Sequence, residues 1–170
     1  MRMQGGGRAV TPDGPDARTG SFDDFYEASA PKAMRLALLL TSSPDDAHDV
    51  THDAFVGMLQ RWPEIEDPAA YLRRSIANGA ASTYRRRAGR RAREERLRSA
   101  IATAAPPPAE YLADQIEALP FPQRAVIVLK YFADLTEREI ADATGMRPGS
   151  VGPTLARALD RLRKETDHEH

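Results

Sequence analysis

Apolar residues recur every three or four positions along much of the chain, and strict apolar–polar alternation is found nowhere. This period indicates amphipathic helices and argues against strands. The sequence therefore predicts an all-α protein. The expected helices cover approximately residues 22–41, 44–62, 68–87, 114–119, 122–132, 136–145 and 150–165.

Polar residues with capping side chains stand immediately before four of these runs. A Ser, Thr or Asp oxygen at this position accepts a hydrogen bond from an amide that has no acceptor inside the helix. In Thr136-Glu-Arg-Glu139 the acid three residues later completes a capping box. The expected capping residues are Ser21, Ser43, Asp67 and Thr136.

Composition divides the helices into two groups. Residues 1–20 are rich in Gly, Pro and Asp without a hydrophobic period, which predicts a disordered tail. Residues 99–110 contain three consecutive prolines, which interrupt a helix and are typical of a flexible linker. We therefore expect two small helical domains, at residues 21–98 and 111–170.

Several classes of protein are excluded by what the chain lacks. No apolar run approaches the ~20 residues that a membrane span needs, and the N-terminus has no apolar signal core, so a cytoplasmic location is expected without membrane insertion. With no cysteine there is no disulfide framework, thiolate nucleophile or thiolate zinc site.

The net charge of −1 conceals a strong segregation of charge. Residues 21–70 hold ten acidic and three basic residues, a net charge of −7. Residues 71–98 hold ten arginines and two glutamates, a net charge of +8. This separation predicts two different electrostatic partners.

The acidic side chains Asp45, Asp49 and Asp53, with His52, are expected on the exposed face of one helix. Such a stripe suits a basic protein surface, although an ordinary solvated face is the alternative. Asp45, His48, Asp49 and His52 also have the i, i+3, i+4, i+7 spacing of metal ligands. One helix cannot surround an ion, however, and no second ligand group is evident, so no metal is expected.

The arginines between Arg85 and Arg98 follow Tyr71 and Tyr84 on one predicted helix. Rings that stack on bases and guanidinium groups that hold phosphates suit nucleic acid. A solvated basic helix end, or an arm that binds RNA, fits the same charges.

Residues 136–163 have the spacing of a helix-turn-helix, with the turn at Gly145. An ordinary structural hairpin of helices has the same spacing. The outward basic residues favour DNA, because they would line a phosphate track. They are Arg157, Arg161, Arg163 and Lys164.

In this order, the parts resemble the extracytoplasmic-function sigma factors of bacterial RNA polymerase, from about Phe22 to Lys164. The resemblance is carried by Leu38-Leu-Leu-Thr41 with Asp46-Ala-His-Asp-Val-Thr-His-Asp-Ala-Phe55, by Asp67-Pro-Ala-Ala-Tyr-Leu-Arg-Arg74 with Asn78 and Tyr84-Arg-Arg-Arg87, by Ala118-Leu-Pro-Phe-Pro-Gln-Arg-Ala-Val-Ile-Val-Leu129, and by Leu135-Thr-Glu-Arg-Glu-Ile-Ala141.

The resemblance implies a protein without catalytic residues or cofactors that lends promoter preference to polymerase. The acidic helix would grip the clamp helices of the largest subunit of core RNA polymerase. The linker would run toward the RNA exit path, and the second domain would read the −35 element and touch the flap. An anti-sigma factor is left open as a further partner. The residues implied in core polymerase binding are Asp45, Asp49, His52 and Asp53. Those implied in recognising and opening the −10 element are Tyr71, Arg74, Asn78, Tyr84, Arg85, Arg86 and Arg87.

The chain departs from the family at three places. His52 replaces a usual glutamine, Thr51 replaces an aliphatic residue, and Gly152-Pro153 replaces polar residues such as Lys-Ser. Pro153 has no amide hydrogen, so it fits only the first turn of a helix. We therefore expect the reading helix to run from Ser150, as its N-cap, to about Glu165, after an extended turn at 146–149.

That placement leaves the tip of the reading helix short of long polar side chains, which predicts weak or altered −35 recognition. The residues expected to face DNA there are Arg147, Ser150, Thr154, Arg157 and Arg161.

Two other functions are alternatives to that of a sigma factor. A stand-alone regulator would bind operator DNA without polymerase, which the −7 first unit and the proline-rich linker argue against. A hydrolase built on the histidine helix would lose activity with a chelator.

Overall fold

The computed structural model describes residues 20–97 and 112–167, so the expected linker and all but Gly20 of the expected tail lie outside the described residues. The described residues are helical, without a strand, which confirms the all-α prediction. They form α1 (Phe22–Thr41), α2 (Pro44–Gln60), a 3-10 turn (Trp62–Glu64), α3 (Pro68–Leu97), α4 (Leu112–Ala118), α5 (Phe121–Tyr131), α6 (Glu137–Thr144), a second 3-10 turn (Pro148–Ser150) and α7 (Val151–Asp167).

The four predicted helix starts are confirmed by their hydrogen bonds. The Ser21 and Ser43 hydroxyls accept from the amides of Asp24 and Asp46, at 3.2 and 3.3 Å. Asp67 accepts from the Ala70 amide at 2.9 Å. Thr136 and Glu139 form the complete capping box. Local side-chain chemistry is therefore sufficient to begin these helices.

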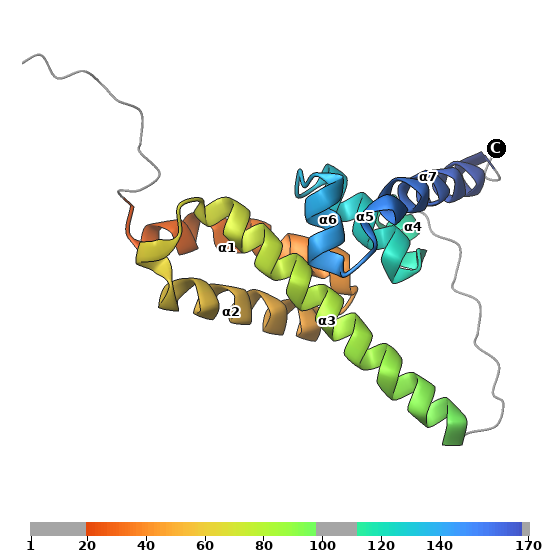
Figure 1. Cartoon of the computed structure of the whole chain (residues 1–170), viewed down its shortest axis with the longest axis horizontal. Helices are drawn as coiled ribbons and strands as arrows, with labels where there is room; N and C mark the ends of the chain where they lie inside the picture. The colour runs from red at the N-terminus through yellow and green to blue at the C-terminus, as the bar shows by residue number, and fades with distance from the viewer. Residues whose placement is uncertain (1–19, 98–111, 168–170) are drawn as a thin grey trace, which may run out of the picture.

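Helices α1, α2 and α3 pack around a shared apolar core, in which Leu40, Met58 and Ile76 are almost fully buried. At one end, the ring of Trp62 lies edge-on to Phe22, with 5.4 Å between the ring centroids. Helix α3 continues ten residues past the predicted end at Arg87, and its last turns project beyond the other helices (Figure 1).

Helices α4 to α7 form the second helical unit, with α5 at its centre. Val126, Val128 and Leu129 of α5 are fully buried, together with Ile140 of α6 and Val151 of α7. The second unit packs on the first, because α6 lies along α3 and α5 contacts α1 (Figure 1). A single cluster of buried apolar residues runs through both units.

The start of the reading helix is partly as predicted. Helix α7 begins at Val151, so Pro153 occupies its first turn, where no intrahelical amide bond is lost. The prediction that Ser150 is the N-cap is wrong, because Ser150 belongs to the 3-10 turn and its hydroxyl donates to the Arg147 carbonyl at 2.8 Å. A serine cap usually accepts from the second or third helical amide, and here the third helical residue is a proline without one. The extended turn expected at 146–149 is likewise 3-10 from Pro148 onward.

Candidate nucleic-acid interface

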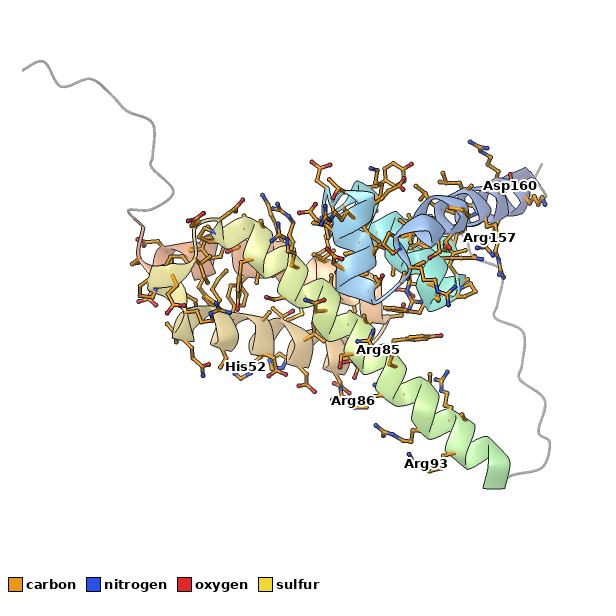
Figure 2. The ribbon with its side chains drawn as sticks, viewed as in Figure 1. His52, Arg85, Arg86, Arg93, Arg157 and Asp160 are labelled. Atoms are coloured by element: carbon orange, nitrogen blue, oxygen red, sulfur yellow. The ribbon has the colours of Figure 1, made fainter. Side chains whose placement is uncertain are left out.

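The acidic stripe lies on the open face of α2. The side chains of Asp49, His52 and Asp53 are 81%, 66% and 86% exposed, and Figure 2 shows His52 on the outer side of the helix. Asp45 is also exposed. Asp46 instead turns inward, with 15% of its side chain exposed, and forms an ion pair with Arg87 at 2.6 Å.

Helix α2 also forms a groove with α3 along the edge of this open face, and the cavity there has a volume of about 620 Å³. Asp49 and Asp53 line its α2 wall, while Tyr71, Asn78 and Arg86 line its α3 wall. The residues expected to bind polymerase, Asp49 and Asp53, therefore line the same groove as three residues expected to bind DNA. Polar donors, carboxylates and an aromatic ring in one cavity can hold an extruded base by stacking and by its edges.

The three consecutive arginines on α3 point to different partners. Arg85 donates to the Thr144 carbonyl at 3.1 Å, Arg86 donates to the Thr83 hydroxyl at 3.2 Å, and Arg87 holds Asp46. Figure 2 shows Arg85, Arg86 and Arg93 following one another down α3 toward its projecting end. All three are exposed, and Arg93 lies beyond the packed region.

Two further α3 residues of the predicted −10 site contact the second helical unit. The Tyr84 ring stacks on Phe121 of α5, with 4.3 Å between the centroids and 11° between the planes. Arg74 donates to Glu139 of α6 at 2.9 Å. The pKa of the Glu139 carboxyl is lowered from 4.5 to about 2. The largest causes are the hydrogen bonds from the Thr136 backbone and hydroxyl, and the hydrogen bond from Arg74 has a smaller effect.

Some of the residues predicted to contact the −35 element are exposed to solvent, and others are not. Arg147, Arg157 and Arg161 are exposed, but Thr154 is buried, with 7% of its surface exposed, so it does not face outward as expected. The Arg157 guanidinium folds back along its own helix and donates to the Pro153 carbonyl at 3.2 Å.

The tip of α7 also lies close to a carboxylate. A Cβ atom on Gly152 would lie 3.6 Å from Glu137 Oε2. A negative side chain beside the amides of a helix N-terminus takes the position that a phosphate oxygen would otherwise favour. Weak recognition of DNA by the tip of α7 remains a prediction.

One structurally important residue was missed by the sequence analysis. Arg124 lies in the largely apolar helix α5 and is 9% exposed, and it donates to the carbonyls of Leu40, Glu117 and Leu119. Burial lowers the pKa of its guanidinium. An arginine directly before the apolar run Ala125–Leu129 was the available signal, and it did not indicate which carbonyls the side chain would reach.

Across the residues that the structure describes, no group of three or more His, Cys, Asp or Glu side chains is placed to hold a metal ion. His48 and His52 stack with 6.4 Å between their rings, and each lies nearest to the aspartate that follows it. The same part of the chain contains no helix that is long and apolar enough to cross a membrane.

Comparison with known proteins gives matches over both helical units. The sigma-70 region 2 family model matches residues 25–91, and the sigma-70 region 4 model matches residues 109–162. An RNA polymerase sigma-E factor of Streptomyces coelicolor is 33% identical over 150 residues, which are 85% of this chain and 85% of that protein. The sigma-E factor of Streptomyces avermitilis is 33% identical over 152 residues, 86% of this chain and 85% of its own.

Solved structures share the fold. The sigma factor RpoE in complex with the anti-sigma factor NepR from Bartonella quintana has a TM-score of 0.63 and 23% identity, over 88% of this chain and 98% of that one. CnrH in complex with the cytosolic domain of CnrY has a TM-score of 0.56 and 22% identity, over 91% of this chain and 94% of that one.

Proposed function

Because the chain belongs to the extracytoplasmic-function group of the sigma-70 family, it is a sigma factor that directs RNA polymerase to promoters, and we propose how its surfaces divide this work. The acidic stripe of Asp45, Asp49, His52 and Asp53 binds the clamp helices of the largest polymerase subunit in the cytoplasm. The observation that carries this assignment is the exposure of Asp49 and Asp53, whose carboxylates have no arginine or lysine partner in the described residues.

The groove between α2 and α3 receives the opened −10 element. Tyr71 and Asn78 line the groove together with Arg86, so a ring, an amide and a cation surround one cavity of about 620 Å³. Base stacking on an aromatic ring offsets part of the few kcal/mol that are lost when a base leaves the duplex. Arg74, Tyr84, Arg85 and Arg87 extend this site along α3.

Helix α7, through Arg157 and Arg161, and Arg147 before it contribute a weaker contact to the −35 element. The support for a weak contact is the Gly152-Pro153 tip with Glu137 beside it, together with the inward Thr154 and the internally bonded Ser150. An anti-sigma factor is a further proposed partner, because both structural neighbours were solved with a second protein.

Reconstituted transcription tests the assignment. The protein and core RNA polymerase would transcribe a template library with a randomised promoter, and the promoters recovered are expected to be constrained more strongly at −10 than at −35. Asp49→Arg with Asp53→Arg is expected to weaken core binding at least about tenfold, because it places like charges against a basic surface. Glu27→Arg with Glu66→Arg makes the same change of charge elsewhere and is the matched control.

Equal core binding by both pairs would overturn the clamp assignment. Specific DNA binding without polymerase, at the sequences selected in the presence of polymerase, would instead favour the stand-alone regulator.

A further inference from the structure

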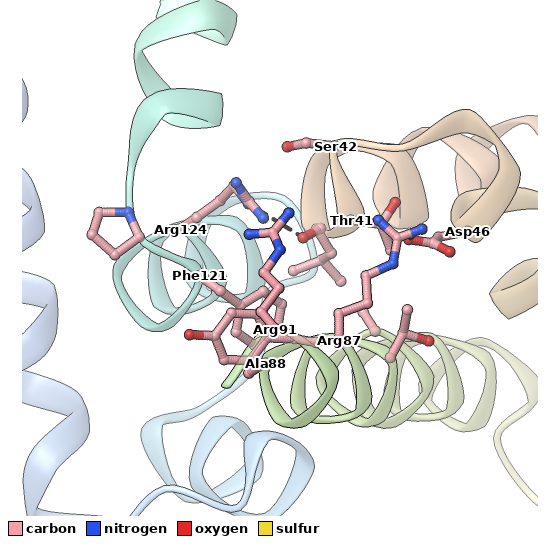
Figure 3. Close-up of a pocket in the computed structure, with 13 residues that line it drawn as sticks. Thr41, Ser42, Asp46, Arg87, Ala88, Arg91, Phe121 and Arg124 are labelled. Atoms are coloured by element: carbon pink, nitrogen blue, oxygen red, sulfur yellow. Dashed lines mark hydrogen bonds and ion pairs between the residues drawn. The ribbon is translucent and has the colours of Figure 1, made fainter. Parts of the chain in front are cut away.

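A second cavity, of about 570 Å³, lies on a different face of α3 from the groove that α3 forms with α2. The α3 residues that line this cavity include Ala80, Tyr84, Arg87, Ala88 and Arg91. Those that line the groove include Tyr71, Ser75, Asn78, Ser82 and Arg86. At about 100° per residue, the two sets lie on opposite faces of the helix. The end of α1 and the start of α5 supply the other walls of the cavity (Figure 3).

The charges around this cavity are not balanced. Figure 3 shows the guanidinium groups of Arg87, Arg91 and Arg124 around it, with the Phe121 ring below them. The single carboxylate among the described lining residues is that of Asp46, which is paired with Arg87. Neither Arg91 nor Arg124 forms an ion pair with any other residue that the structure describes. Two cations of the cavity therefore have no anionic partner from the described part of the protein.

Arg124 is the buried cation of this pair, with 9% of its surface exposed. Burial removes hydration from a charge, which then needs partners from the protein or from a ligand. Its Nε and Nη1 atoms donate to three backbone carbonyls. Its Nη2 atom carries two further N–H groups, which have no acceptor within the described ranges. Arg124 can therefore still donate to an anion.

The donors of the cavity combine a fixed guanidinium with a free one. The three carbonyls hold Arg124, and the centroid of the Phe121 ring lies 5.9 Å from its guanidinium carbon. A donor that is already ordered loses less entropy when a ligand binds. Arg91 is exposed and makes no hydrogen bond to another described residue, so it can turn toward a ligand. The Ser42 hydroxyl lines the same cavity and is likewise without a partner among these residues.

These donors match the chemistry of phosphate. The planar fork of a guanidinium binds two phosphate oxygens at once, and such charge-assisted pairs are strong. The cavity is much larger than one phosphate group, and its volume is within the range of about 300–1,000 Å³ that is typical of small-molecule sites. Leu40, Ala80, Ala88 and Phe121 make another part of the wall apolar. A fitting ligand therefore has phosphate groups at one end and an apolar or ring-shaped portion at the other.

We propose that the cavity between α1, α3 and α5 is a binding site for a phosphorylated small molecule of the nucleoside diphosphate or triphosphate class, whose phosphates are held by Arg91 and Arg124. This site is additional to the surfaces of the proposed function, and it needs neither polymerase nor promoter DNA. Because its walls come from three helices that meet only in the folded chain, a bound ligand also raises thermal stability.

Calorimetric titration of the full-length chain with ADP tests the site. The titration contains no polymerase, DNA or magnesium, and all solutions have the same ionic strength. ADP is expected to bind and to raise the Tm of the chain. Adenosine is expected to bind at least about tenfold more weakly, because it has the ring but no phosphate to pair with the arginines.

Two pairs of variants locate the bound ADP. Arg91→Ala is expected to weaken ADP binding about tenfold, because it removes one charge-assisted contact. Arg93→Ala is its control, since Arg93 is exposed on the same helix and does not line the cavity. Ala88→Phe occupies part of the cavity without a change of charge and should also weaken binding about tenfold, whereas Ala92→Phe, one turn further along, should not. Tyr84 and Arg87 are left unchanged because they belong to the proposed DNA surface.

Two results would overturn the site: no binding of ADP by the folded chain, and equal ADP affinity of Arg91→Ala and Arg93→Ala. The second would indicate diffuse attraction to the basic end of α3. Weaker binding of a single-stranded −10 oligonucleotide by Arg91→Ala, with ADP binding unchanged, would assign Arg91 to DNA instead. Each of these results leaves the proposed function intact, because that function is tested by transcription with core polymerase.

Discussion

Gly79 allows α3 to approach α2, and its replacement is a quantitative test of the packing that forms the −10 groove. A Cβ atom at position 79 would lie 3.0 Å from Val50 Cγ1. The favourable separation of two carbon atoms is about 3.5–4.0 Å, so one of the two helices has to move. Gly79→Ala is therefore the perturbation.

Two opposing effects set the change in the free energy of unfolding that Gly79→Ala causes. Alanine favours a helix interior over glycine by about 1 kcal/mol, whereas overpacking costs about 1–3 kcal/mol. Gly79→Ala is thus expected to lower the free energy of unfolding by up to about 2 kcal/mol. Val50 is 5% exposed, and Val50→Ala should cost about 2 kcal/mol in lost burial and cavity formation. In the Val50→Ala background the clash is absent, so Gly79→Ala should become stabilising by about 1 kcal/mol.

Urea unfolding followed by the fluorescence of Trp62, the single tryptophan, measures the four corners of this cycle. Gly89→Ala is the matched control, because it lies on the same helix with nothing within 4 Å of the added Cβ, and it should raise stability by at most about 1 kcal/mol. If Gly79→Ala changed the midpoint equally in both backgrounds, the close approach of α2 and α3 would not be what requires the glycine.

Two further predictions concern α6 and α7. The lowered pKa of Glu139 means that its contribution to stability is present above about pH 4.5 and is lost as the pH falls toward 2, so the difference in thermal stability between the wild type and Glu139→Gln should shrink over that range. A constant difference would contradict it. Gly152→Lys has room beside Glu137 and should strengthen binding of −35 duplex DNA about threefold or more, with Gly149→Lys as a control for added charge. Equal gains from both lysines would indicate charge alone.

The helix starts could be predicted from the sequence because the interactions that determine them are local. A capping side chain acts on an amide two or three residues away, so Ser21, Ser43, Asp67 and Thr136 could be identified without knowledge of the fold. The same locality explains why Pro153 was placed correctly in the first turn of α7. It also explains the error at Ser150, since the 3-10 turn before α7 gives its hydroxyl a different partner.

The candidate sites also contain features that one helix determines and features that depend on tertiary packing. An exposed stripe on α2 follows from the period of one helix, and Asp49 and Asp53 are exposed as that period predicts. The burial of Thr154 does not follow from charge or polarity, because it depends on what packs against α7.

The sequence by itself determined the all-α class and most helix starts, the segregation of charge and the family to which the chain belongs. Only the tertiary structure decided which arginines are held within the protein. Arg85 reaches a carbonyl 59 residues away, and Arg124 reaches one 84 residues away. Caps and helical periods act over three or four residues, whereas these partners meet because two helical units pack together. That packing places the arginines at helix ends that have no cation of their own.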